Sequence, residues 1–127
     1  MADSGVAFGY LLLINDVLKD HILGLRPAEK QRLLEKLEFL ANGIWDAGVR
    51  VKKLKGLSGK VVFEARLSRG ERILFTLGRH DGRIAIYLWG IVSHDDVDRL
   101  GRSIVPGNAP FLLFESQSSE EKPELVV

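Results

Sequence analysis

Residues 61–97 read VVFEARLSRGERILFTLGRHDGRIAIYLWGIVSHDDV, and this stretch decides the fold. Apolar and polar side chains alternate in residues 61–67 and again in residues 72–77, as in strands that bury one face. Pairing Arg66 with Arg72 leaves a three-residue loop at 68–70. Gly70 then occupies the position at which such loops usually have a residue in the left-handed conformation. The same register aligns Phe63 with Phe75 on one apolar face, so the two segments predict a β-hairpin.

A second hairpin follows from Asp81-Gly82, a pair typical of two-residue turns between antiparallel strands. This turn predicts that Leu77 lies opposite Ile86 and that Phe75 lies opposite Leu88, again on the apolar face. On the other face the two opposed arginines repel each other unless solvent or an anionic group lies beside them. Three rows are expected on that face: Val62–Thr76–Tyr87, Glu64–Leu74–Trp89 and Arg66–Arg72–Ile91.

The segments on either side complete an α+β domain. Upstream, residues 6–14 favour a strand, Asn15 caps a short helix that stops at Gly24, and Pro27 opens a helix with a leucine stripe. Downstream, residues 93–101 favour a short helix that stops at Gly101 and holds His94 near the arginine row. The expected order is an N-terminal strand, two helices, an antiparallel three-stranded meander and a short C-terminal helix.

Composition and charge narrow the class of protein. The chain has 127 residues, no cysteine and a formal net charge of +1, which predicts one domain without disulfides or Cys-ligated zinc. No apolar run is long enough to span a membrane, and no targeting signal precedes the first strand, so we expect a cytoplasmic protein. Residues 50–102 carry 12 basic and 6 acidic residues, and such a basic segment is a candidate for phosphate contact.

The chain is expected to divide at residue 102. Residues 1–102 form the domain, and residues 103–127 lose periodicity, contain proline and glycine, and predict a linker or tail. Residues 111–114, FLLF, are too apolar to remain in solvent, so they pack on the domain or meet a partner. The apolar end after an acidic linker favours a further domain downstream in a longer chain.

Four segments carry a resemblance to a known family: KKLKGL at 52–57, FEARL at 63–67, ERILF at 71–75 and IYLWGIVSHDDV at 86–97. In this order and spacing the chain resembles the RelE/ParE toxin superfamily over about residues 8–100. The resemblance implies a toxin-type domain with an antitoxin partner. Nucleases of this superfamily cleave messenger RNA, usually on the ribosome, without a metal or other cofactor. Other members poison DNA gyrase, and similar domains begin larger proteins such as helicases.

A metal-independent endoribonuclease needs a proton acceptor, a proton donor and cations beside the phosphate. His94 is the candidate acid or base because an unperturbed imidazole titrates near neutrality. Arg66 and Arg72 are the candidate phosphate clamp. The remaining candidates bind RNA: Lys52, Lys53 and Lys55 through its backbone, and Tyr87 and Trp89 by stacking. Histidines 21, 80 and 94 share no spacing that would indicate a metal site.

Each candidate has a structural alternative. His94 can be a helix-start residue, Glu64 and Asp95 can neutralise the arginines, and residues 111–114 can cover Trp89. The alternative function is therefore a noncatalytic module that binds protein or nucleic acid, for example at the N-terminus of a helicase-like protein.

Overall fold

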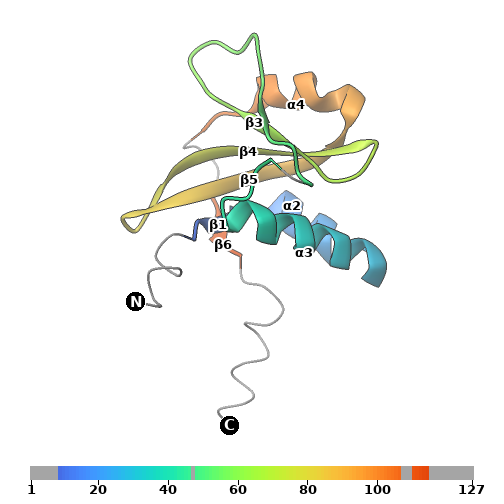
Figure 1. The fold of residues 1–127 in the computed structure, drawn as a ribbon. Helices are drawn as coiled ribbons and strands as arrows, with labels where there is room; N and C mark the ends of the chain where they lie inside the picture. The colour runs from blue at the N-terminus through green and yellow to red at the C-terminus, as the bar shows by residue number, and fades with distance from the viewer. Residues whose placement is uncertain (1–8, 47, 107–109, 115–127) are drawn as a thin grey trace.

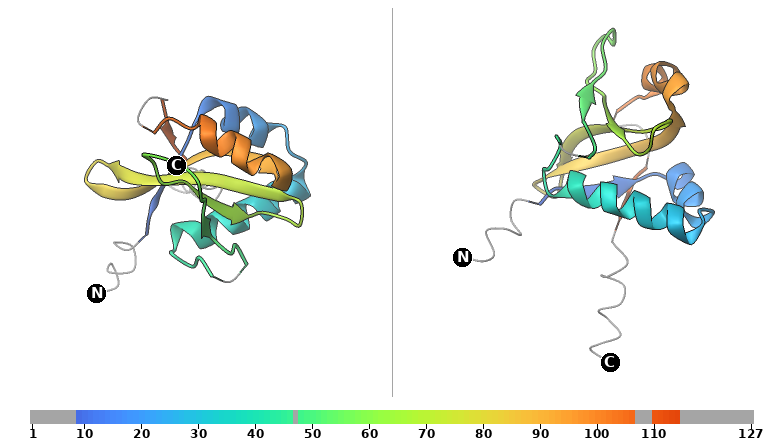
Figure 2. Two further views of the ribbon diagram at one scale, coloured as in Figure 1. Left: turned by 90° about the horizontal axis from the view of Figure 1, so that it is seen from above. Right: turned by 45° about the vertical axis from the view of Figure 1, so that its right-hand side comes forward.

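The computed structural model describes residues 9–46, 48–106 and 110–114 and shows a mixed α+β fold (Figure 1). A six-stranded sheet has the order β2-β3-β4-β5-β1-β6, in which β1 runs parallel to β5 and the other neighbours are antiparallel. Helices α2 and α3 cover one face of the sheet and α4 covers the other, as the views in Figure 1 and Figure 2 agree. We call these the helix-pair face and the α4 face.

The first elements form as their sequence predicts. Strand β1 (Leu11–Ile14) leads to α2 (Asp16–Leu23), whose first turn is capped where Asn15 Oδ1 accepts a hydrogen bond from Leu18 N at 2.8 Å. Helix α3 (Pro27–Ala41) begins with proline, whose fixed φ suits a first turn. The expected strand 6–14 is shorter here, and its residues 6–8 lie outside the described residues.

The β3–β4 hairpin has the predicted register throughout, and the β4–β5 hairpin has it from the turn as far as Phe75 and Leu88. Strands β3 (Phe63–Arg66) and β4 (Glu71–His80) pair Arg66 with Arg72, while β4 and β5 (Arg83–Ser93) pair Phe75 with Leu88. Asp81 and Gly82 have φ values of 52° and 81°, the left-handed pair that a two-residue turn requires. The prediction that Gly70 adopts the left-handed conformation is wrong, because the φ of this residue is not positive. Its carbonyl instead accepts a hydrogen bond from His94 N at 2.8 Å.

A β-bulge in β5 corrects two of the three expected rows. Leu74 pairs with Gly90 whereas Phe75 pairs with Leu88, so Trp89 is an extra residue in β5. Arg72 therefore lies opposite Val92 rather than Ile91. The Trp89 carbonyl, freed from the ladder, accepts a hydrogen bond from Asn15 Nδ2 at 3.2 Å. The bulge is fixed by this contact from the end of β1, which is distant in sequence.

Each face of the sheet has its own apolar core. The helix-pair face buries leucines of α2 and α3 against alternate residues of the meander, including Ile73, Phe75, Ile86 and Leu88. The α4 face buries a smaller cluster of Leu54, Val62, Leu74, Val97 and Ile104. The second cluster anchors α4 and the loop between β2 and β3 over the middle of the sheet.

The C-terminal helix differs from expectation at its end. His94–Asp96 form a 3-10 turn, η1, and α4 runs from Val97 to Ser103. Gly101 is therefore not the predicted stop. A Cβ at Gly101 would lie 2.8 Å from Leu54 Cδ1, so glycine here permits close packing of α4 on the loop.

Two edge strands of two residues each were not predicted. Strand β2 (Lys52–Lys53) pairs with β3, and β6 (Leu112–Leu113) pairs with β1. The sheet thus includes residues beyond the boundary expected after residue 102, while residues 115–127 lie outside the described part. In that described part, no helix combines the length and the apolar character needed to cross a membrane.

Candidate functional site

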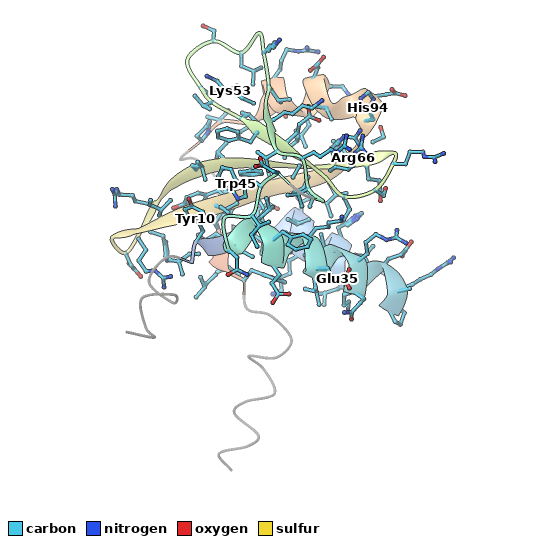
Figure 3. The ribbon with its side chains drawn as sticks, in the orientation of Figure 1. Tyr10, Glu35, Trp45, Lys53, Arg66 and His94 are labelled. Carbon is cyan, nitrogen blue, oxygen red and sulfur yellow. The ribbon has the colours of Figure 1, made fainter. Side chains whose placement is uncertain are left out.

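A shallow pocket lies on the α4 face near the β3–β4 hairpin, with a volume of about 60 Å³. We call it the cationic pocket, because its lining combines four cationic side chains with one carboxylate and one imidazole: Arg50, Lys52, Arg66, Arg72, Glu64 and His94. Figure 3 shows Arg66 and His94 on the same side of the molecule. The structure therefore brings together all three residues predicted to be catalytic.

The two opposed arginines have different environments. Arg72 is only 9% exposed, its Nη1 donates to the carbonyls of Ser68, Arg69 and Glu71 at 3.0–3.2 Å, and its Nε lies 3.6 Å from Glu64 Oε1. These contacts compensate the charge of Arg72. Within the described residues Arg66 makes no side-chain hydrogen bond or ion pair, so its guanidinium is the one available to an anion.

Arg50 joins this site through an unusual backbone conformation. Its φ is 44°, which costs energy for a residue with a Cβ. Hydrogen bonds on both sides hold the segment: Val51 N donates to Trp45 O at 2.9 Å, and Arg66 N donates to Val49 O at 2.6 Å. The sequence offers no signal for this conformation, and Arg50 was therefore missed as a candidate.

His94 stands at the rim of the pocket. Its backbone N–H is bound to Gly70 O, which fixes the start of η1 against the β3–β4 loop. The imidazole is 65% exposed, and its Nδ1 lies 3.7 Å from Asp95 Oδ1. The exposed imidazole is therefore accessible from solvent at the edge of the cationic pocket.

The remaining RNA-binding candidates are dispersed. Lys52 pairs with Glu64 across β2 and β3 and lines the pocket, whereas Lys53 pairs with Phe63 and points to the other face. Lys53 and Lys55 are exposed but do not line the pocket. Tyr87 and Trp89 line a different cavity, nearer the β4–β5 turn, where both contact Phe111.

This arrangement of strands and helices is a RelE-like fold. Among solved structures the chain is similar to the archaeal RelE–RelB complex from Pyrococcus horikoshii OT3, with 21% sequence identity and a TM-score of 0.53. The similarity covers 67% of this chain and 94% of that chain. At this identity it shows the fold alone. A scan against protein-family models and a search of curated proteins gave no match.

Proposed function

We propose that this chain is a RelE-like toxin-type domain that binds RNA phosphate in the cationic pocket. The observation that carries the proposal is the convergence of Arg50, Lys52 and Arg66 on one pocket beside His94. A guanidinium presents two parallel N–H donors to a phosphate, so Arg66 binds the anion while Arg72 supports the hairpin.

The same pocket supplies the two groups that metal-independent RNA cleavage needs. In the proposed reaction the Glu64 carboxylate accepts the ribose 2′-hydroxyl proton, and the 2′-oxygen attacks the adjacent phosphorus. The bond from phosphorus to the 5′-oxygen breaks, and the protonated His94 imidazole gives its proton to that leaving oxygen. The products are a 2′,3′-cyclic phosphate and a 5′-hydroxyl. Arg66 and Lys52 stabilise the charge that develops on the phosphate oxygens.

A protein partner belongs to the proposal. The similar archaeal RelE was crystallised with RelB. We propose that an antitoxin protein likewise binds this chain. We also propose that the ribosome presents the RNA, since the shallow pocket encloses little of a substrate by itself.

The second candidate is a noncatalytic RNA-binding module. It is favoured by the pairing of Glu64 with Arg72 at 3.6 Å, which engages the carboxylate that the cleavage reaction would use. In this case the pocket binds phosphate and no bond is broken.

The experiment measures RNA binding and RNA cleavage separately, with and without ribosomes. Arg66→Ala should weaken binding about tenfold, the loss expected for one charge-assisted contact. His94→Ala should abolish cleavage and leave binding within about twofold, because the imidazole at the rim mainly transfers a proton.

Matched controls lie on the opposite side of the sheet: Arg32→Ala on α3 and His21→Ala on α2 should change neither quantity. Binding that depends on Arg66, without cleavage by any form, would leave the noncatalytic module. Equal losses from Arg66→Ala and Arg32→Ala would refute the phosphate site itself.

A further inference from the structure

A second cavity lies on the α4 face near the β4–β5 turn, and the cationic pocket shares no residue with it. Its volume is about 400 Å³. We call it the aromatic pocket, after three of its lining residues, Tyr87, Trp89 and Phe111. From this geometry we infer that it binds an unstacked nucleobase, through ring stacking on these side chains.

The rings are held as walls rather than stacked on one another. Phe111 meets Tyr87 at a centroid distance of 5.1 Å and an angle of 89°, and it meets Trp89 at 4.9 Å and 77°. In an edge-to-face contact the edge of one ring covers part of one face of the other, so the surface open to a flat ligand is the part of each ring that lines the cavity. Base–aromatic stacking accepts any of the four bases.

Hydrogen bonds fix the walls before any ligand arrives. The Tyr87 hydroxyl donates to Arg79 O at 2.8 Å, and Trp89 Nε1 donates to Thr76 Oγ1 at 3.0 Å. Each ring therefore has its polar atom satisfied and presents carbon to the cavity. A pre-ordered wall loses little side-chain entropy when a ring stacks on it.

Gly78 keeps the floor of this pocket open. A Cβ at Gly78 would lie 3.0 Å from Tyr87 Cε1, so a larger residue would displace the tyrosine ring. Beside it the His80 side chain is 39% exposed, and its Nε2 lies 3.6 Å from Asp81 Oδ2, so Nδ1 is the ring nitrogen left for a ligand. An imidazole can donate or accept a hydrogen bond, as the edge of a base requires. Three aromatic walls with one such group suit a nucleobase better than an aliphatic ligand.

The two tryptophans of the chain provide the measurement. Trp89 lies in the aromatic pocket, whereas Trp45 packs between Tyr10, Phe63 and Phe75 in the helix-pair core. In proton–nitrogen correlation spectra the Trp89 indole N–H should shift saturably with uridine or adenosine monophosphate. The Trp45 signal should stay in place. Ribose 5-phosphate, which lacks a base, should shift neither.

Phe111→Ala should weaken the nucleotide affinity about 5- to 100-fold, the range expected for losing one stacking partner. Leu112→Ala, the next residue and an exposed one, is the matched control and should leave it unchanged. Gly78→Val should also weaken binding, by displacing Tyr87.

The affinity for a short single-stranded RNA distinguishes whether the bound base belongs to RNA or to a free nucleotide. Affinity well above that of the monophosphates assigns the pocket to RNA, and equal affinity assigns it to a free nucleotide. No saturable Trp89 shift, or an equal shift with ribose 5-phosphate, would overturn the inference. Because the Trp89 shift with a monophosphate reports on the aromatic pocket and not on the cationic pocket or on cleavage, failure of this inference is distinct from failure of the proposed function.

Discussion

At the scale of single residues, Arg50 has a strained backbone conformation and a side chain that lines the cationic pocket. A left-handed backbone at a non-glycine residue persists only where its surroundings hold it, and such residues often lie at functional sites. Here the flanking hydrogen bonds to Trp45 and Arg66 hold the segment, and the side chain lines the cationic pocket. The conformation costs the fold stability and places a charge beside Arg66.

Arg50→Gly should therefore separate stability from binding. Relief of the left-handed strain gains roughly 1–2 kcal/mol, and the greater freedom of glycine in the unfolded chain returns about 0.4–1 kcal/mol. We expect a net gain of up to about 1.6 kcal/mol in the free energy of unfolding, with RNA affinity several-fold weaker. Urea denaturation and an RNA titration measure the two quantities.

Asp81→Gly is the matched control, since Asp81 has a φ of 52° in the distant β4–β5 turn. It should stabilise the fold less than Arg50→Gly does, because aspartate tolerates the left-handed region, and it should leave binding in the cationic pocket as it was. If Arg50→Gly lowers stability, the assignment of strain to this residue is wrong.

At the scale of elements, Asn15 links a helix cap to a β-bulge. Its Oδ1 caps α2 through Leu18 N, and its Nδ2 binds the carbonyl of the bulged residue, Trp89. Asn15→Asp keeps a good cap acceptor but removes the donor, which should cost about 1–3 kcal/mol. Asn15→Ala removes both contacts.

Hydrogen exchange resolves the two roles. Amides of β5 around Trp89 should exchange faster in both variants, whereas Leu18 N–H should exchange faster only in Asn15→Ala. A bulge that stays as protected as wild type in Asn15→Asp would mean that the sheet alone holds Trp89 in place.

Helix α4 depends on the absence of a side chain at Gly101. Gly101→Val should destabilise the fold by about 1–3 kcal/mol, because the new side chain enters the space of the buried Leu54. Thermal denaturation measures the effect. Gly70→Val is the control, since nothing lies within 4 Å of a Cβ there and the backbone is not left-handed. Equal stability of the two variants would show that Leu54 moves aside freely.

These elements also show how far local sequence reasoning reaches. The register of the β3–β4 hairpin, that of the β4–β5 hairpin near its turn and the cap at Asn15 were predicted, because turn chemistry and side-chain alternation act within a few residues. The bulge at Trp89 and the packing role of Gly101 were not, since each depends on a contact with a distant segment. The candidate site follows the same division: Arg66, Arg72 and His94 were predicted to meet, whereas the strained Arg50 was not.

At the scale of the whole molecule, the near-neutral net charge conceals a polarised distribution. Residues 50–102, with 12 basic and 6 acidic residues, include every residue that lines the cationic pocket. Residues 1–49 carry 5 basic and 7 acidic residues, and those of α2 and α3 lie on the opposite face of the sheet. An RNA strand should therefore approach the molecule from the α4 side.

This polarity makes the number of phosphate contacts measurable. Each contact to a single strand changes the slope of log K against log salt concentration by about −0.7, so Arg50, Lys52 and Arg66 together predict a slope of about −2. Arg66→Ala should reduce its magnitude to about 1.4, while Arg32→Ala on the far side should leave it at about 2. Titrations of single-stranded RNA at several salt concentrations provide the slopes. A slope near zero for the wild type would exclude phosphate recognition. An equal reduction of the slope by both variants would mean that RNA binds the surface without preference for the cationic pocket.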